Sequence, residues 1–345
     1  MPGKLMRYSG LITKTRAMSS SLLTEEDLKE LTELATVSEV IDYLKGTGSY
    51  GPIYRGREGI WHRGQAEEII NRSLITDFEK IYRFADAGQR QTLSNVFFRY
   101  EVNRLKECLK GLFQNEGEGS GIAVDPFWQK HMRCDVDRLN RVESLAELEQ
   151  ALAGTPYHRI FQKLQGAGKK EYADYAMGLD IFYYSSVYKE VKRRKNSDTK
   201  KILLEIYGTH IDWLNILWIY RYRRFYDQTP AELVGILIPH TYRLKKEELM
   251  GMITAADLAE RNRILAGTAY FKGKDAFVRM ADEISYQEVI GTMYQRVSKK
   301  YRVSMAPVLR YLYEKEQEIG RLTTIIEGIR YQLPPKDLRE LILVN

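Results

Sequence analysis

The stretch Leu44-Lys45-Gly46-Thr47-Gly48-Ser49-Tyr50 indicates the fold of this chain, because two later stretches repeat its pattern. They are Leu152-Ala153-Gly154-Thr155-Pro156-Tyr157 and Leu265-Ala266-Gly267-Thr268-Ala269-Tyr270. In each, the glycine can supply the left-handed backbone that often ends a helix, and the tyrosine can fold its ring back over the last turn. The pattern therefore predicts a helix end at three places in the chain.

A second phrase recurs in the same order: an acid, two residues, an Asn or Arg, and an aliphatic residue. It occurs at Glu101 with Arg104 and Leu105, at Asp212 with Asn215 and Ile216, and at Glu318 with Arg321 and Leu322. Both phrases return about every 110 residues, which exceeds the roughly 20 to 50 residues of common solenoid repeats. Each copy is therefore expected to be a small domain in its own right.

The repeat predicts three tandem helical domains, over residues 1–124, 125–240 and 241–345. The glycine-rich segment Gln114–Gly121 marks the first boundary, and the second is expected between Pro239 and Lys246, where a proline removes a helix donor and charge rises. A chain of 345 residues that is 44% hydrophobic can bury real cores. Its longest apolar stretch, from Trp213 to Tyr220, falls far short of the roughly 18 residues that a membrane span needs.

Helix starts recur along the chain as a Ser or Thr followed three residues later by an acid, a pattern typical of a capping box. They begin at Thr24, Ser144, Thr229, Thr254 and Ser285. A last long helix is expected from about Ala306, and Leu333-Pro334-Pro335 is expected to stop it. Alternating patterns typical of strands do not persist for more than a few residues. The sequence predicts an all-α protein.

Cysteine content, the first residues and the net charge indicate the cellular compartment of the protein and the kinds of partner it can bind. The chain has only two cysteines, Cys108 and Cys134, and its opening Met1–Gly10 lacks the apolar core of a secretory signal. A reducing, cytosolic setting is expected. The net charge of +7 fits ordinary solubility, but also an acidic partner surface, a nucleic acid or an anionic membrane face.

Signatures of catalysis and of cofactor binding are missing from the sequence. In Gly117–Gly121 acids alternate with the glycines, and Gly166–Lys170 lacks the first glycine and the Ser/Thr of a phosphate-binding loop. His131 and Cys134 have the spacing of half a metal site, but no second half is present. We therefore expect no catalytic residue, no cofactor and no metal.

Two basic stretches leave a second hypothesis open. Residues 189–201 are rich in Lys and Arg, and residues 218–226 interleave aromatic residues with Arg. Proteins that bind RNA use such residues, because aromatic rings stack on the bases and basic side chains contact the phosphates. Trp213, Tyr220 and Arg224 fall on one helical stripe, so packed aromatic rings beneath arginines explain the second stretch more simply. A helical RNA-binding or scaffold protein is the alternative function.

The acid phrase supplies the candidate functional residues, because it places a carboxylate and an Asn or Arg on one side of a helix. Two roles are open. The groups can pair inside each copy, or they can line a socket if the three helices converge around a common axis. The candidates are Glu101, Arg104, Asp212, Asn215, Glu318 and Arg321.

Three groups of residues resemble one protein family. They are Tyr8 with Arg16-Ala17-Met18 and Leu22-Leu23-Thr24 at the opening; His210-Ile211-Asp212-Trp213-Leu214-Asn215-Ile216 with Arg221 and Arg223 at the centre; and Glu314-Lys315-Glu316-Gln317-Glu318-Ile319 with Leu322, Ile325 and Leu333-Pro334 at the close. Together they resemble the single-copy component of V-type and A-type rotary ATPases that joins the central stalk to the membrane ring. It is named the C subunit in prokaryotes and the d subunit in eukaryotes.

The resemblance implies a funnel of three similar helical domains around a pseudo-threefold axis. It implies a peripheral position on the cytoplasmic mouth of the proteolipid ring, with one copy per complex and the foot of the central shaft held in the funnel. Torque would pass through this socket to drive H⁺ or Na⁺ transport, or ATP synthesis in reverse. The resemblance implies a structural role in which the chain binds no nucleotide and carries no ion.

Overall fold

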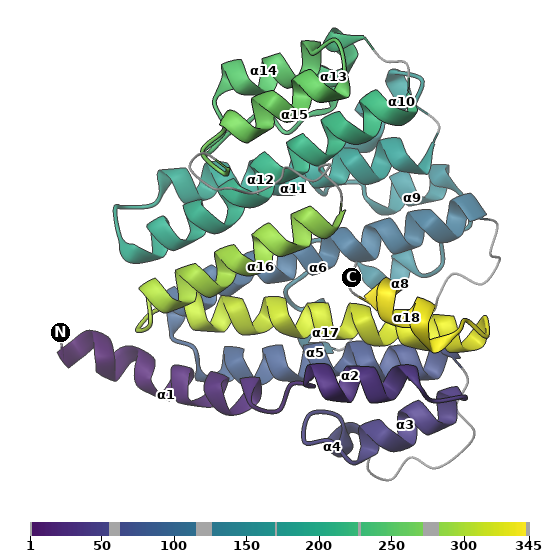
Figure 1. Ribbon diagram of the computed structural model, residues 1–345, viewed down its shortest axis with the longest axis vertical. Coiled ribbons are helices and arrows are strands. Elements are labelled where there is room, and N and C mark those ends of the chain that lie inside the picture. Colours follow the sequence, from purple (N-terminus) through teal and green to yellow (C-terminus); the bar gives the residue numbers. More distant parts are fainter. Residues whose placement is uncertain are drawn as a thin grey trace. The chain divides into compact units, whose positions relative to one another are not determined.

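The computed structural model describes residues 2–54, 63–114, 126–169, 171–226, 229–271 and 283–342. Within these ranges the chain forms eighteen helices and no strand, so the all-α prediction is confirmed (Figure 1). The chain divides into two compact units: unit 1 combines Met1–Arg90 with Glu283–Asn345, and unit 2 is Gln91–Asp282. The three ranges 1–124, 125–240 and 241–345 stay a prediction.

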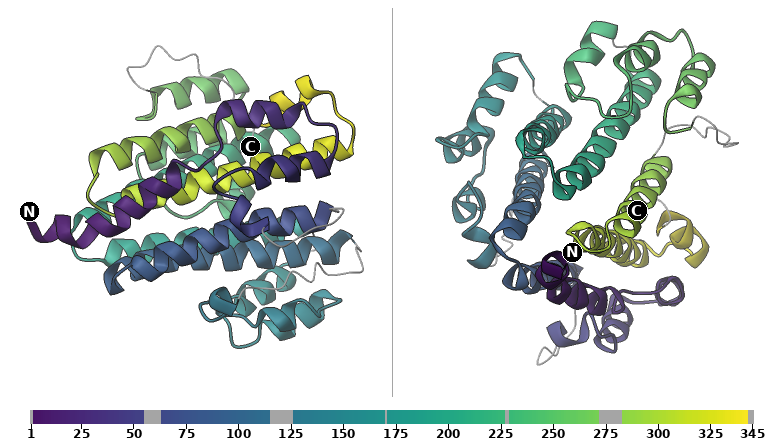
Figure 2. Two further views of the ribbon diagram at one scale, coloured as in Figure 1. Left: turned by 90° about the horizontal axis from the view of Figure 1, so that it is seen from below. Right: turned by 90° about the vertical axis from the view of Figure 1, so that its left-hand side faces the viewer.

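Unit 1 is built around one long helix from the end of the chain. Its helices are α1 (Pro2–Ser19), α2 (Glu25–Thr32), α3 (Val37–Lys45), α4 (Gly51–Tyr54), α5 (Arg63–Phe84), α16 (Glu283–Lys300), α17 (Ala306–Arg330) and α18 (Pro335–Ile342). Helix α17 packs against α1, α2, α3, α5, α16 and α18 (Figures 1 and 2). Its Leu322 and Ile326 are buried with Leu31 and Ile41 of the first helices. Both ends of the chain therefore share one core.

Unit 2 holds three long helices, two of which pack against each other, and several short ones. Its helices are α6 (Ala87–Gln114), which begins at the end of unit 1, α7 (Pro126–Gln129), α8 (Val136–Leu139), α9 (Leu145–Ala151), α10 (His158–Gly166), α11 (Tyr172–Arg193), α12 (Asp198–Phe225), α13 (Pro230–Ile236), α14 (Lys246–Thr254) and α15 (Leu258–Gly267). A short turn joins α11 to α12, and the two pack side by side (Figure 1). Helix α12 is buried along most of its length.

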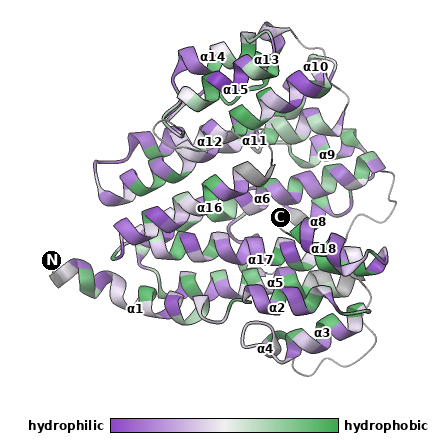
Figure 3. Ribbon diagram, viewed as in Figure 1, coloured by the Kyte–Doolittle hydropathy of each residue, from purple (hydrophilic) through white to green (hydrophobic). Residues whose placement is uncertain are grey.

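Amphipathic patterns explain how these helices pack. Along α17, hydrophobic and hydrophilic residues alternate in the way expected of a helix with one face in a core (Figure 3). Of the helices in the described ranges, none is long and apolar enough to cross a bilayer.

Three of the five predicted helix starts are confirmed. Thr24 and Thr229 form capping boxes, and Ser144 accepts a hydrogen bond from the backbone N–H of Glu147 at the start of α9. The start predicted at Thr254 is wrong, because Thr254 ends α14 and Asp257 caps α15 instead. Helix α16 begins at Glu283, so Ser285 lies in its first turn and not at its cap. Asp257 shows the physical reason, since an acid is itself a strong N-cap.

The predicted end of the last long helix before Leu333-Pro334-Pro335 is confirmed. Helix α17 begins at Ala306 and ends at Arg330, and Gln332 then takes a left-handed conformation with φ 54°. The backbone N–H of Leu333 donates to the carbonyl of Gly328 at 2.9 Å, which is the bond that closes a Schellman motif. Pro335 starts a further helix, α18.

The glycine of the first repeated phrase behaves as predicted in one copy only. Gly154 has φ 80°, whereas Gly46 keeps a right-handed conformation with φ −75° and Gly267 is the last residue of α15. The threonine is the constant element, because in all three copies its hydroxyl donates to the carbonyl of the preceding leucine. The distances are 2.8 Å from Thr47 to Leu44, 2.6 Å from Thr155 to Leu152 and 2.7 Å from Thr268 to Leu265.

Gly208 allows a close approach of Tyr242 to α12. A Cβ atom at position 208 would lie 2.4 Å from Cγ and 2.5 Å from Cβ of Tyr242. We expect Gly208→Ala to lower the free energy of unfolding by about 1–2 kcal/mol, because overpacking outweighs the gain of about 1 kcal/mol in helix propensity. Gly320→Ala in α17 is the control, since nothing lies within 4 Å of its Cβ position, and it should stabilise the protein. Urea unfolding of both variants tests this, and a stabilising Gly208→Ala would contradict it.

Candidate functional site

The two repeated phrases meet in space. In each of three places, the hydroxyl of the tyrosine that closes the first phrase donates to the acid of the second. The distances are 2.8 Å from Tyr157 to Glu101, 2.8 Å from Tyr270 to Asp212 and 2.6 Å from Tyr50 to Glu318. The tyrosine therefore joins a short helix to a long one, whereas the sequence predicts only that it covers its own helix end. We call these contacts the Tyr–carboxylate pairs.

Each acid also binds the backbone of a loop. Glu101 accepts from the N–H groups of Arg133 and Cys134, and Glu318 accepts from that of Leu23. Asp212 accepts from three consecutive N–H groups at 2.9, 2.7 and 3.0 Å, those of Tyr242, Arg243 and Leu244. Burial raises the pKa of Asp212, and these hydrogen bonds, with that of Tyr270, oppose the shift.

The second short helix after each loop, which is α3, α9 or α15, is capped in the same way. Thr36, Ser144 and Asp257 accept a hydrogen bond from the N–H of Glu39, Glu147 and Glu260. The same three glutamates accept the N–H of Ala35, Glu143 and Ala256 at 2.8, 2.9 and 2.8 Å. The repeat seen in the sequence is thus also a repeat of individual hydrogen bonds.

We define a module as one acid-bearing helix together with its bound loop and tyrosine. The modules are α6 with residues 133–157, α12 with residues 242–270, and α17 with residues 23–50. The first two are continuous in sequence and lie in unit 2, and the third joins the two ends of the chain within unit 1. The boundaries predicted after residues 124 and 240 fall inside the first two modules.

The third module differs by a lysine buried beside its acid. Lys315 has no exposed side-chain surface, and its Nζ lies 2.6 Å from Oε1 of Glu318 and 3.2 Å from Oγ of Ser49. The Nζ also lies 3.9 Å from the centre of the Tyr50 ring. Burial lowers the pKa of Lys315, and the charge of Glu318 opposes that shift. The corresponding positions before Glu101 and Asp212 hold Phe98 and Thr209.

The arginines of the second phrase pair with other acids. Arg104 donates to Glu107 at 2.6 Å, and Arg321 donates to Glu25 at 2.9 Å. The acids bind tyrosine and backbone donors instead, and Glu101 and Glu318 are 1% and 5% exposed. Pairing inside the phrase, one of the two roles that the sequence leaves open, is therefore not formed by Arg104 or Arg321, and the socket role stays a prediction.

Asn215 and Asp212 bind neighbouring parts of one segment. The Asn215 side chain accepts from the N–H of Ile238 at 2.9 Å and donates to its carbonyl at 3.0 Å. Both Asp212 and Asn215 have 0% exposure. The middle copy of the phrase thus fastens residues 238–244 to α12 from inside the protein.

The Tyr–carboxylate pairs should stabilise the fold measurably. We expect Tyr157→Phe to lower the free energy of unfolding by about 1.5 kcal/mol, because it removes a buried hydrogen bond to a carboxylate. Tyr188→Phe is the matched control, since that hydroxyl donates to a neutral carbonyl, that of Thr241, at 3.2 Å. The control variant should lose less free energy of unfolding than Tyr157→Phe does. Urea unfolding of both variants measures the two losses. An equal loss in both variants would contradict a special role for the carboxylate.

His131 and Cys134, which have the spacing of half a metal site, each contact other groups. The His131 ring stacks on Phe97 with centroids 4.2 Å apart, and its Nδ1 lies 2.8 Å from the carbonyl of Phe127. The Cys134 thiol lies 3.1 Å from Glu101, and burial raises its pKa, which keeps it protonated. Within the described ranges no group of three or more His, Cys, Asp or Glu residues could hold a metal.

The basic stretches are used inside the protein only in part. Trp218 and Tyr220 are 6% and 5% exposed, and Arg223 donates to the carbonyl of Ala255 at 3.2 Å. Lys200 donates to carbonyls at the end of α11, those of Lys192 and Arg194. Phe225 and Tyr226 are the exposed aromatic rings of residues 218–226, and both lie at its end. The glycine-rich stretch lies outside the described residues beyond Gln114.

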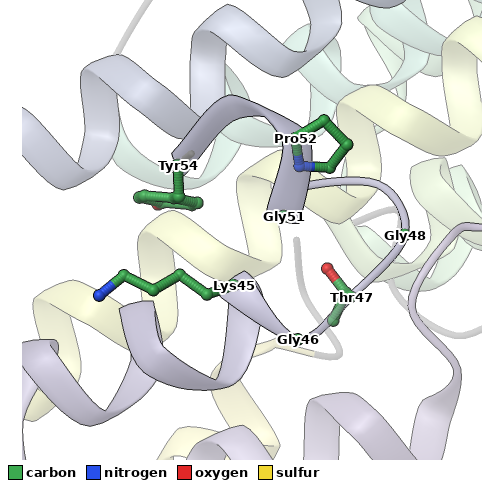
Figure 4. A pocket seen from close by; sticks show the side chains of 7 residues that line it. All are labelled: Lys45, Gly46, Thr47, Gly48, Gly51, Pro52 and Tyr54. Carbon is green, nitrogen blue, oxygen red and sulfur yellow. The ribbon is translucent and has the colours of Figure 1, made fainter. Parts of the chain in front are cut away.

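A pocket of about 510 Å³ lies beside the first copy of the glycine phrase (Figure 4). It is lined by Lys45, Gly46, Thr47, Gly48, Gly51, Pro52 and Tyr54. The Nζ of Lys45 donates to Asp42 at 2.7 Å, and the hydroxyl of Thr47 donates to Leu44. Among the described residues, the lining therefore does not bring together an acid, a base and a nucleophile for catalysis.

Comparison with known proteins finds a match over nearly the whole chain. The model of the ATP synthase (C/AC39) subunit family matches residues 11–341. The chain belongs to this family. The C subunit of the A-type ATP synthase of Archaeoglobus fulgidus is 23% identical, over 99% of this chain and 98% of that protein. The protein of the same name from Methanosphaera stadtmanae is 23% identical, over 96% of this chain and 86% of that protein. The one from Thermococcus kodakarensis is 24% identical, over 98% of this chain and 91% of that protein.

Proposed function

We propose that this chain is the non-catalytic rotor subunit that links the central stalk of a V-type or A-type rotary ATPase to its proteolipid ring. The family match over residues 11–341 is the observation that carries this proposal. In the proposal the chain sits on the cytoplasmic face of the membrane, one copy per complex. It transmits torque for H⁺ or Na⁺ transport and binds neither nucleotide nor ion.

The local chemistry suits a part that must transmit torque without deforming. Each Tyr–carboxylate pair ties a long helix to a loop and to a short helix by buried hydrogen bonds to a charged group, which are among the stronger ones in proteins. A rigid connection of this kind is needed wherever force applied to one helix must be transmitted to its neighbours. The buried acids Glu101, Asp212 and Glu318 would hold the walls of a socket from inside.

A funnel of three related domains is part of the same proposal. Three modules with matching hydrogen bonds support it, and so does the way the third module joins residues 23–50 to α17. Arg104 and Arg321, which bind Glu107 and Glu25, would then lie beside the socket walls and not inside the Tyr–carboxylate pairs.

The first test is a pull-down of the tagged full chain from native membranes. Recovery of the stalk and ring subunits of a rotary ATPase, with about one copy of this chain per complex, is the expected result. Recovery of RNA or of unrelated proteins without those subunits would overturn the proposal.

Salt tests the electrostatic part of the proposal. The chain carries a net charge of +7, and attraction between exposed charges is screened within about 8–10 Å at physiological salt. The affinity for the shaft should therefore fall as salt rises. An affinity that is the same at low and high salt would show that charge does not contribute to binding. Shape complementarity and apolar contact would then explain it.

A further inference from the structure

The end of α12 exposes aromatic rings beside arginines. Phe225 and Tyr226 are 66% and 54% exposed, although burying rings of this size is favourable. The Arg224 guanidinium lies 5.0 Å from the centre of the Phe225 ring, and the Tyr226 ring lies 5.0 Å from that of Tyr222. We call residues 221–226 the α12 tip.

The same pair of residues recurs at the end of α17. There Arg330 lies 5.6 Å from the centre of the Tyr331 ring, and Tyr331 is also 66% exposed. Arg330 and Tyr331 stand as far along the chain from Glu318 as Arg224 and Phe225 stand from Asp212. An exposed Arg–aromatic pair at the same register of two modules is therefore a repeated feature and not a single irregular helix end.

The first module lacks this feature. At the corresponding positions of α6 it has Phe113 and Gln114, and the ring of Phe113 packs against Tyr172 and Tyr175 with centroids 6.3 and 6.0 Å away. The fold can thus bury an aromatic ring near this point when its neighbours allow. Exposed aromatic rings beside arginines, as at the other two ends, have the composition of protein interaction sites.

Charge indicates the chemistry of that partner. Helix α12 carries Arg221, Arg223 and Arg224 near its end and no acid after Asp212. Three arginines thus outnumber Asp227, which follows the tip in the sequence, and the charges of Asp174 and Glu171 act on Tyr222. Arg221 and Arg224 are exposed, and Glu232 on the next helix accepts hydrogen bonds from Thr229 at its own N-cap. Guanidinium groups favour carboxylates, which they can bind through two parallel hydrogen bonds.

A protein fits this surface better than RNA does. Proteins that bind single strands track the phosphates along a basic groove and stack successive bases on several rings. Here Trp218 and Tyr220 are buried, so the exposed rings are confined to one end of the helix. A few aromatic residues flanked by arginines have instead the composition of protein interface hot spots.

We propose that the α12 tip docks a carboxylate-bearing protein segment of another subunit of the complex. This inference rests on the proposed function. It assigns to residues 221–226 a role that the family match does not give, and it explains why this basic aromatic stretch ends in exposed rings.

Charge reversal in the full chain tests the proposal. The tagged variants Arg224→Glu and Phe225→Ala are compared with Arg193→Glu, which makes the same charge change at an exposed position at the end of α11. The amount of rotary ATPase subunits that co-purifies at moderate salt should fall about tenfold or more for the tip variants, as for a hot-spot residue. The control should match the wild type, and circular dichroism checks that all three variants keep their helices.

A photo-crosslinker at position 226 identifies what is bound. The expected adduct is a peptide rich in Asp and Glu from another subunit of the complex. Adducts with lipid or RNA alone, or no adduct above that of a crosslinker placed at the exposed Phe84, would overturn the inference. If the wild type recovers the subunits and Arg224→Glu recovers them equally, only this inference fails. If the wild type recovers none, the proposed function itself fails.

Discussion

Replacing Glu318 by alanine is expected to lower the free energy of unfolding by about 3–5 kcal/mol, the loss typical of a buried charge left without its partner. Lys315 has no exposed side-chain surface, and its Nζ lies 2.6 Å from the Glu318 carboxylate. The same substitution removes the acceptor of the Tyr50 hydroxyl and of the Leu23 N–H. Urea unfolding of the variant and the wild type measures the loss.

Two further variants show whether the buried charge is the cause. Glu314→Ala removes the partially exposed partner of Arg310 on the same helix and should cost less than about 1 kcal/mol. Lys315→Met combined with Glu318→Gln removes both charges but keeps an acceptor oxygen for Tyr50 and Leu23. This double variant should recover much of the loss, because an ion pair replaced by neutral groups of similar size is often tolerated. If it is no more stable than Glu318→Ala, the unpaired lysine does not explain the loss.

The third Tyr–carboxylate pair also bears on how the chain folds. Tyr157 and Tyr270 bind acids that precede them by 56 and 58 residues, whereas Tyr50 binds an acid 268 residues later. Residues 23–50 cannot complete their module until α17 has been made. Local contacts form before contacts that close long loops, so the first two modules are expected to form earlier than the third.

The helices could be predicted from the sequence because their signals are local. Thr24, Ser144 and Thr229 are caps whose partners lie three residues away, and periodic apolar residues mark the faces of α17. The errors at Thr254 and Ser285 arise where an acid or another residue can begin the helix equally well. Such choices depend on a few tenths of a kcal/mol and on tertiary packing, which a sequence pattern does not contain.

The site could be predicted only in part because its contacts are long-range. Both repeated phrases are visible in the sequence, and the second of them points to the acids Glu101, Asp212 and Glu318. The sequence suggests partners three residues away on the same helix, whereas the tyrosines bind these acids from another helix. The shared period of the two phrases is the available signal, since groups that repeat together can also contact one another. Nothing local distinguishes Lys315 from a surface lysine.

Acid should destabilise unit 2 through His210. The side chain is 5% exposed, and burial, together with the positive charge of Arg99, lowers the pKa of His210 to about 3. The ordinary pKa of the unfolded chain is about 6.5, so below that value the unfolded chain takes up a proton that the folded chain refuses. Stability is therefore intact above pH 6.5 and is lost as the pH falls toward 3. The loss relative to pH 7 should be about 2 kcal/mol at pH 5 and about 3 kcal/mol at pH 4.

Comparison with His210→Gln isolates this contribution from that of the carboxylates, which also titrate below pH 5. Glutamine stays neutral across the range, so the variant should lose less stability than the wild type between pH 7 and pH 4, by about the amounts given above. The measurement is the free energy of unfolding in urea at intervals of half a pH unit. Parallel pH profiles for the two proteins would show that His210 takes up its proton in the folded state as readily as in the unfolded chain. The neighbouring Asp212 and its three backbone donors would then lie in a wetter environment than their burial implies.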